Sequence, residues 1–335
     1  MQGKIAVEEH FAFQESVADA ERVAGRSPFW PVLKRRLVEF DQERLEEMDK
    51  AGIEFSVLAL NSPAAQGMLS AKGAVDFCRR ANDFLAEQVA KHPDRLVPLA
   101  AVPMQDPDAA AQELTRCVKD LGFKGTLVHG YTHQEGVADS AVYYDLPQYL
   151  PFWAQVEQLG VPFYLHPRQP LPSQQLMYQG HPWLMSAAWA FGVETATHTL
   201  RLICSGLFDR YPKLNVIVGH LGEGLPFMIW RVDHTVTRIR QGITIKKKPS
   251  DYLRSNFYLT TSGNFHTLSM IDAMLEIGSD RILFAVDYPF QRMDEGAEWF
   301  DGASINDLDK LKIGRLNSLK LFNVPVAEST HATAG

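Results

Sequence analysis

The feature that most constrains the fold is the alternation of short apolar segments with longer amphipathic ones along almost the whole chain. The apolar segments predict strands at 4–10, 54–60, 96–103, 124–130, 162–167, 214–220, 256–263 and 281–289. The amphipathic segments predict helices at 41–51, 71–91, 107–121, 146–160, 191–209, 224–240, 266–278 and 304–321. Nearly unbroken apolar strands that alternate with helices are typical of a parallel sheet covered on both faces. The pattern therefore predicts an α/β fold, a closed (β/α)8 TIM-like barrel.

The competing architecture is a doubly wound open sheet, but no G-x-G-x-x-G follows the first predicted strand. We expect residues 1–325 to form one domain. Residues 326–335 have few large apolar side chains and are expected to form a flexible tail. Segments 11–40, 168–190 and 241–255 are insertions between the regular elements. The second insertion is rich in proline and aromatic residues, and we expect it to form a lid or a subunit contact.

Charge and cysteine content exclude several classes of protein. The net charge of −7 argues against nucleic acid or an anionic membrane as a partner. The three cysteines are far apart and outside any C-x-x-C pattern, so neither a disulfide framework nor a thiolate zinc site is predicted. No basic, apolar leader precedes the first strand, and no apolar run reaches the roughly 18–20 residues that span a membrane. We therefore expect a cytoplasmic protein.

Polar side chains recur at the carboxyl ends of the predicted strands, where parallel barrels carry their reacting groups. Glu8 and His10 end the first strand, and other strands end in His129, His166, His220 and Asp287. Glu8 and His10 are two residues apart and so share one face of the strand. Glu9 points the opposite way, and we expect it to pair with an arginine or lysine of a neighbouring helix. A single histidine at a strand end is ordinarily solvated, but repetition at one rim predicts a functional site.

Four of these residues form a plausible ligand set for one divalent metal ion. Glu8, His10, His166 and Asp287 supply two imidazoles and two carboxylates. Mixed nitrogen and oxygen ligands suit Zn²⁺ or Mn²⁺ and leave a position open for water or substrate. The sequence therefore predicts a metal site at the carboxyl ends of the strands.

A second group of polar residues follows the sixth strand, in VIVGHLGEGLPFMIWRVDH. Glu223 is three residues after His220 and can hydrogen-bond that imidazole and fix its tautomer, or it can cap the following helix. Arg231 can bind a substrate carboxylate through two parallel hydrogen bonds, or it can form a surface ion pair.

Several stretches resemble one family over residues 3–322. GKIAVEEHF, VPFYLHPRQPLP, SGLFDRYPKLNVIVGHLGEGLPFMIWR and DRILFAVDYPF resemble the amidohydrolase superfamily, in its non-hydrolytic branch of aromatic decarboxylases. The similarity is greatest to the 2,6-dihydroxybenzoate (gamma-resorcylate) decarboxylases, which share Glu-x-His on the first strand. This resemblance implies a homotetramer and one metal ion bound by Glu8, His10, His166 and Asp287.

The resemblance also implies roles for the other site residues. His220 and Glu223 match an active-site pair, and Arg231 matches an active-site arginine. His129 and Phe290 are expected beside the substrate ring. His129 stands where these decarboxylases usually have asparagine, so the ring pattern of the substrate stays open.

The expected reaction is a reversible, non-oxidative decarboxylation of an ortho-hydroxybenzoate such as 2,6-dihydroxybenzoate. Asp287 would protonate the ring carbon that carries the carboxylate, His220 would steady the substrate oxygens, and Arg231 would offset anionic charge. The alternative is a metal-dependent hydrolase of a lactone, ester or amide, with Asp287 as the base. A barrel that binds metal for structure alone, or a binding protein, is the third reading.

Overall fold

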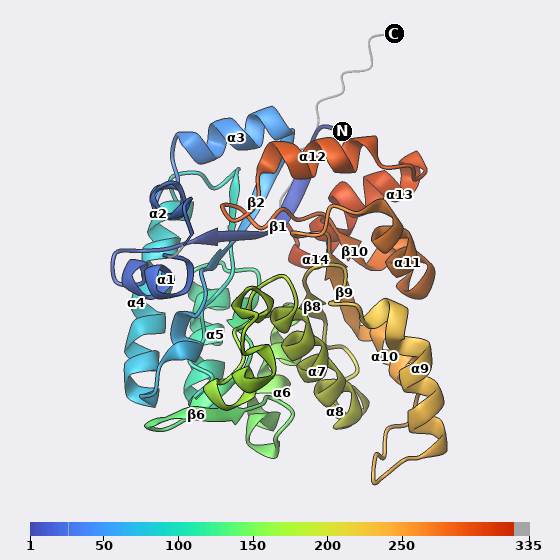
Figure 1. Ribbon diagram of the computed structural model, residues 1–335. Helices are drawn as coiled ribbons and strands as arrows, with labels where there is room; N and C mark the ends of the chain where they lie inside the picture. Colours follow the sequence, from blue (N-terminus) through green and yellow to red (C-terminus); the bar gives the residue numbers. More distant parts are fainter. Residues whose placement is uncertain (26, 325–335) are drawn as a thin grey trace.

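The computed structural model describes residues 1–25 and 27–324, so the expected tail at 326–335 lies outside the described residues. Parallel strands run through its centre and helices surround them (Figure 1). The strands of the barrel are β1 (Lys4–Phe11), β2 (Ile53–Leu60), β3 (Leu96–Pro98), β4 (Thr126–His129), β7 (Phe163–His166), β8 (Val216–Val218), β9 (Phe257–Thr260) and β10 (Ile282–Leu283). Each lies within or beside a segment that the sequence predicts as a strand.

The strands close into a barrel through contacts at two seams. Regular pairing gives the runs β1-β2-β3 and β4-β7-β8-β9-β10. Ala100, just after β3, bridges to Thr126 of β4. On the other side, the amide of Val7 in β1 donates to the carbonyl of Phe284, just after β10, at 3.1 Å. The predicted α/β barrel is therefore confirmed.

The outer layer contains the predicted helices and several further elements. The predicted helices correspond to α3 (Glu43–Ala51), α4 (Ala71–Val89), α5 (Pro107–Asp120), α6 (Leu150–Leu159), α7 (Ala190–Cys204), α8 (Leu207–Arg210), α9 (Leu225–Arg238), α11 (Thr267–Ile277), α13 (Asp307–Leu311) and α14 (Asn317–Phe322). The three insertions contain α1 (Val17–Ala24), α2 (Trp30–Leu37), the short helices η3 (Pro172–Tyr178) and η4 (Pro182–Met185), and α10 (Pro249–Asn256). Sequence analysis missed the hairpin β5 (Thr132–Gln134) and β6 (Val137–Val142), and α12 (Met293–Gly302). Among the described residues, no helix combines the length and apolarity needed to span a membrane.

A β-bulge in β1 controls which of its side chains enter the barrel. Ala6 pairs with Ser56 and Glu9 pairs with Leu58, so β1 advances three residues while β2 advances two. Val7 belongs to the interior core that includes Tyr164, and the carboxylate of the next residue, Glu8, bonds to the Tyr164 hydroxyl. Two consecutive side chains therefore face inward, which strict alternation would forbid.

His198 on the inner face of α7 gives the fold a sensitivity to acid. The ring is fully buried, and its Nε2 accepts a hydrogen bond from the backbone amide of Tyr144 at 3.2 Å. Burial, with a smaller contribution from Arg201, lowers the pKa of His198 from 6.5 to about 3. Between these values the unfolded chain binds the proton and the folded chain does not. Stability is therefore lost as the pH falls below 6.5, by about 1.4 kcal/mol per pH unit from this group.

We expect His198→Gln to reduce this acid sensitivity, because an amide oxygen can accept the same hydrogen bond without titrating. Urea denaturation of both proteins at pH 6.5, 5.5 and 4.5 would measure the slope. The free energy of unfolding should fall less steeply with acid in the variant. Parallel pH profiles would show that His198 is not responsible.

Candidate metal and catalytic site

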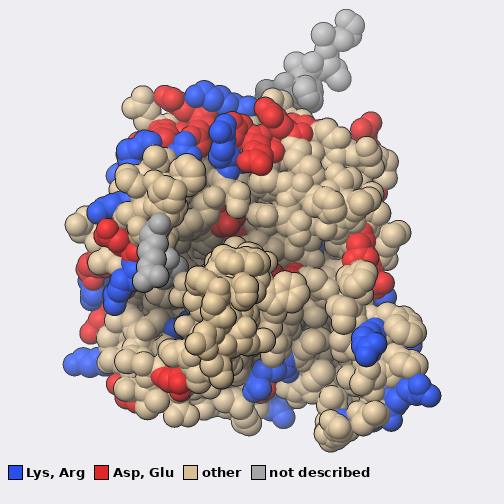
Figure 2. All heavy atoms as spheres, in the orientation of Figure 1, with Lys and Arg blue, Asp and Glu red and all other residues tan. Residues whose placement is uncertain are grey.

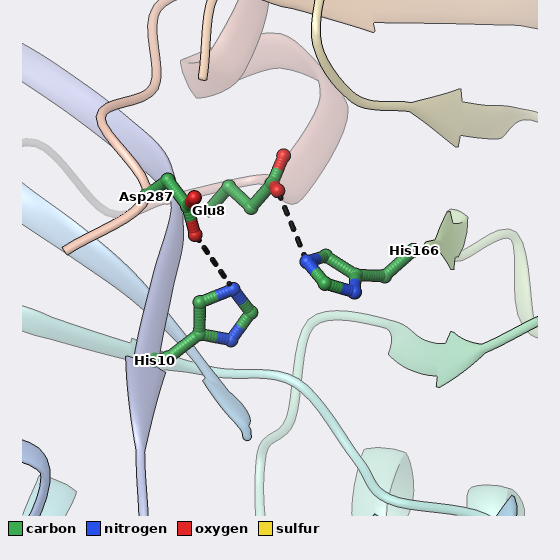
Figure 3. Close-up of side chains that lie close together, drawn as sticks. All are labelled: Glu8, His10, His166 and Asp287. Carbon is green, nitrogen blue, oxygen red and sulfur yellow. Dashed lines mark ion pairs between the residues drawn. The ribbon is translucent and has the colours of Figure 1, made fainter. Parts of the chain in front are cut away.

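Four ionisable side chains converge at the carboxyl end of the barrel (Figure 3). Glu8, His10, His166 and Asp287 each offer a ligand atom, and these atoms lie within 4.8 Å of one another. Nε2 of His10 is 3.2 Å from Oδ1 of Asp287, and Nε2 of His166 is 3.3 Å from Oε1 of Glu8. The structure thus brings together the four residues that the sequence grouped as ligands.

Buried atoms without hydrogen-bond partners show that this cluster suits a cation. Oε1 of Glu8 and both ring nitrogens of His10 are buried and accept or donate no hydrogen bond among the described residues. Buried polar atoms without partners cost free energy. A divalent ion would satisfy Oε1 of Glu8 and one ring nitrogen of His10, and imidazole nitrogen with carboxylate oxygen is a ligand set that both Zn²⁺ and Mn²⁺ accept.

The second oxygen of Glu8 is held by hydroxyl groups. Oε2 accepts hydrogen bonds from the hydroxyls of Tyr164, Thr260 and Ser262. A Cβ atom at Gly219 would lie 2.9 Å from this oxygen, so the glycine makes room for it. Oε2 is therefore fixed, and Oε1 is left for a ligand. Sequence analysis gave these hydroxyls no role, although Tyr164 precedes His166 by two residues and so shares its inward face.

Glu9 holds the backbone on both sides of Asp287. Its Oε1 accepts from the amide of Val286 at 3.0 Å, and its Oε2 accepts from the amide of Tyr288 at 3.1 Å. Burial raises the pKa of Glu9 to about 8, although the backbone hydrogen bonds oppose that rise. Within the described part of the chain this carboxylate forms no direct ion pair with a lysine or arginine, because it binds backbone amides instead. The buried Arg44 of the neighbouring helix α3 acts on it through its charge, which lowers the pKa of Glu9 against the effect of burial.

Asp287 itself has a strained backbone. Its φ of +81° is in a region that residues other than glycine rarely adopt. The Asp287 amide donates to the carbonyl of Glu8 at 2.9 Å, which adds a third bond to the two that Glu9 accepts. Strand β1 therefore carries two of the candidate ligands and also fixes the residue that offers a third.

His220 and Glu223 form a hydrogen-bonded pair at the edge of the cluster. Nδ1 of His220 is 2.7 Å from Oε1 of Glu223, and its Nε2 is 3.5 Å from Oε1 of Glu8. Burial alone would lower the pKa of His220, but the carboxylates of Glu223 and Glu8 outweigh it and raise that pKa to about 10. Glu223 therefore orients the imidazole rather than capping α9, which begins at Leu225.

The turn that carries this pair is also strained. His220, Leu221 and Glu223 have φ values of +54°, +57° and +54°. A Cβ atom at Gly192 of α7 would lie 3.0 Å from Oε2 of Glu223, so that glycine leaves space for the carboxylate. Strained backbone of this kind is typical of functional sites, where it directs a side chain into the site at a cost in backbone free energy.

The three residues predicted to contact the substrate, Phe290, Arg231 and His129, lie at different places relative to the cluster. The Phe290 ring meets the His10 ring edge-on, with centroids 5.8 Å apart, and so borders the site. Arg231 is exposed on α9, and none of the hydrogen bonds or ion pairs in the described part of the chain joins it to the ligands. Both ring nitrogens of His129 are engaged by protein atoms, namely Nδ1 of His166 and the Leu60 carbonyl. His129, which we expected beside the substrate ring, therefore has no free ring nitrogen for a polar contact with a substrate.

The neighbouring imidazoles of His129 and His166 both favour the neutral form. Burial, followed by the neighbouring His166 and His10, holds the pKa of His129 well below its usual value. Burial, followed by His10, does the same to the pKa of His166. A neutral imidazole is the form that binds a metal ion.

Comparisons with known proteins show which family this chain is similar to. The model of the amidohydrolase family matches residues 18–324. The chain is 52% identical to the gamma-resorcylate decarboxylase of Rhizobium sp. (strain MTP-10005) over 97% of this chain and 99% of that protein. It is 53% identical to the gamma-resorcylate decarboxylase of Polaromonas sp. (strain JS666), with the same coverage.

Solved structures are equally similar. A 2,6-dihydroxybenzoate decarboxylase in complex with 2,6-dihydroxybenzoate superposes with a TM-score of 0.93 at 51% identity, covering 96% of this chain and all of that one. A dihydroxybenzoic acid decarboxylase from Polaromonas sp. JS666, with manganese and the inhibitor 2-nitroresorcinol, gives 0.94 at 52% identity. That match covers 99% of this chain and all of that structure.

Proposed function

This chain belongs to the amidohydrolase family, and on that premise we propose that it is a metal-dependent carboxy-lyase. It removes CO₂, without oxidation, from an ortho-hydroxybenzoate such as 2,6-dihydroxybenzoate, and the same site can run the reaction in reverse. The observation that carries the proposal is the convergence of Glu8, His10, His166 and Asp287, in a chain that matches decarboxylases over nearly its whole length. This similarity favours decarboxylation over the hydrolase alternative.

The ligand set would hold one divalent ion, Mn²⁺ or Zn²⁺, whose bound form supplies a Lewis acid that orients the substrate and offsets its charge. Mn²⁺ is supported by the manganese in the similar Polaromonas structure. The described residues provide the rest of the chemistry. His10 and His166 would supply imidazole nitrogens as ligands, and the carboxylates of Glu8 and Asp287 would offset the charge of the cation.

Asp287 is proposed to take the proton of the substrate's ortho hydroxyl group and to deliver it to the ring carbon. Its carboxyl group is partly exposed, with 15% of the side chain accessible, so a ring carbon can approach it. Protonation of the carbon that bears the carboxylate forms the new C–H bond and places positive character on the ring, which the ortho oxygen stabilises. The C–CO₂ bond then breaks, its electron pair restores aromaticity, and CO₂ leaves.

The surrounding residues are proposed to position the substrate. His220, oriented by Glu223, donates a hydrogen bond to substrate oxygens from Nε2, which faces the cluster. Phe290 provides an apolar wall next to His10. Arg231 is exposed on α9. We propose that it offsets the charge of the substrate in an oligomer whose neighbouring subunit encloses it.

We propose that this assembly is a homotetramer. From residue 169 to residue 193 the chain has no lysine, arginine, aspartate or glutamate. The middle of the face in Figure 2 is correspondingly poor in charge. Large apolar side chains stand exposed on this segment and on α9, among them Leu176, Trp183, Trp189, Phe227 and Trp230. Such patches are typical of protein–protein contacts, and light scattering would measure the mass of the oligomer.

We propose that the protein is located in the cytoplasm. Its free cysteines suit that reducing compartment.

We expect the manganese-loaded protein to release CO₂ from 2,6-dihydroxybenzoate and to form resorcinol. The assay would compare 2,6-dihydroxybenzoate, 2,3-dihydroxybenzoate and salicylate, with chelator-treated protein as the control. Protein that binds Mn²⁺ but releases CO₂ from none of them would contradict the proposal. Lactone or ester hydrolysis without CO₂ release would instead support the hydrolase.

A further inference from the structure

His129 at the end of β4 is buried directly behind a ligand of the cluster. None of its surface is accessible, and both of its ring nitrogens have partners. Nδ1 is 2.9 Å from Nδ1 of His166, and Nε2 is 2.8 Å from the carbonyl oxygen of Leu60. The ring is thus fixed at both ends, and no polar atom of it faces the space where a substrate would bind.

The chemistry of these partners determines where the hydrogens lie. A carbonyl oxygen can only accept, so Nε2 of His129 must carry a hydrogen. The ring is buried, and no carboxylate among the described residues bonds to it, so the neutral form is favoured. A neutral imidazole has one N–H, which leaves a lone pair on Nδ1 of His129 as an acceptor.

That lone pair fixes the tautomer of the neighbouring ligand. Since Nδ1 of His129 accepts, Nδ1 of His166 must donate. A second acceptor agrees with this assignment, because the carbonyl of Pro167 lies 3.0 Å from the same His166 nitrogen. The hydrogen on Nδ1 leaves Nε2 of His166 with its lone pair, and Nε2 is the atom that lies 3.3 Å from Oε1 of Glu8 inside the cluster.

We infer that His129 is a positioning residue, which holds His166 in the tautomer and orientation that leave Nε2 free for the metal ion. This inference rests on the proposed function only in taking the cluster to be a metal site. It reassigns His129 from substrate contact to metal-ligand support, so position 129 offers no hydrogen bond for selecting substituents on the substrate ring.

Variants at position 129 separate this role from a general structural one. His129→Asn keeps an acceptor close to the position of Nδ1, His129→Gln moves the acceptor toward the position of Nε2, and His129→Leu has none. Loss of a partner that orients a ligand typically weakens metal binding 10- to 100-fold. We expect the dissociation constant for Mn²⁺, from competition with a fluorescent chelator, to rise by about that factor in the leucine and glutamine variants. The asparagine variant should stay within a few-fold of the parent.

His198→Leu is the matched control, because it also replaces a fully buried histidine, but on α7 and away from the ligands. Its affinity for Mn²⁺ should not change. Since a leucine variant can fail to fold, ¹⁵N NMR of the metal-free parent, labelled at histidine, gives an independent readout. We expect hydrogen on Nε2 of His129 and on Nδ1 of His166.

Hydrogen on Nδ1 of His129, or unchanged Mn²⁺ affinity in His129→Leu, would overturn the inference. Neither measurement depends on the substrate. If the decarboxylase proposal fails, Mn²⁺ still binds tightly and no CO₂ is released. If the His129 inference fails, CO₂ release by the parent protein is unaffected.

Discussion

Replacing Asp287 with asparagine is expected to abolish decarboxylation even when metal is saturating. The amide cannot give a proton to the ring carbon, and general acid catalysis of this kind typically contributes 10²- to 10⁴-fold. Asparagine tolerates positive φ better than most residues, so the backbone at +81° can be kept. We therefore expect kcat to fall by at least about 10²-fold with little change in thermal stability.

The measurement is CO₂ release at increasing Mn²⁺, because Asp287 is also a proposed ligand and its loss should weaken metal binding. Extra metal should restore occupancy but not turnover. Asp280→Asn is the matched control, since Asp280 is exposed and pairs with Lys312. A rate within tenfold of the parent at full occupancy would exclude Asp287 as the acid.

Glu8→Gln is expected to cause the largest loss of metal. The amide has nearly the shape of the carboxylate but no charge. Three hydroxyls hold Oε2 of Glu8, while Oε1 is buried and lacks a partner. The variant therefore removes the only anionic ligand contributed by β1. We expect the Mn²⁺ dissociation constant to rise by more than about 100-fold, beyond the range for residues that act through a ligand, and activity to fall with it.

Metal analysis after gel filtration would measure the effect. Glu46→Gln, on the exposed side of α3, is the control for a change of one charge and should retain the metal content of the parent. Glu9→Gln is a poor control, because Glu9 fixes the residues on both sides of Asp287. Normal metal content in Glu8→Gln would show that Glu8 is not a ligand.

The barrel and its ligand cluster could be predicted because both follow from local pattern. Each strand is a run of apolar residues, and its period of two places the polar residue at the end on the same face as the interior core. Leu127 and His129 show this on β4, and Tyr164 and His166 show it on β7. Polar residues at several strand ends then meet because parallel strands end at one rim.

What could not be predicted depends on register and long-range contact. Counting by twos from Ile5 and Val7 would send Glu8 out of the barrel, and only the bulge against β2 turns it inward. The partners of Glu9 come from the far end of the chain, and no local signal indicates them. The role of His129 depends on the carbonyl of Leu60, a backbone atom that the sequence pattern does not reveal.

The hydrogen bonds between β1 and the segment after β10 have a consequence for synthesis of the protein. Glu8 and His10 emerge from the ribosome long before Asp287, whose amide must reach the carbonyl of Glu8. A nascent chain therefore cannot assemble the complete ligand set until its last barrel strand is available. Metal acquisition then follows closure of the barrel, and a bound ion stabilises only chains that have folded to completion.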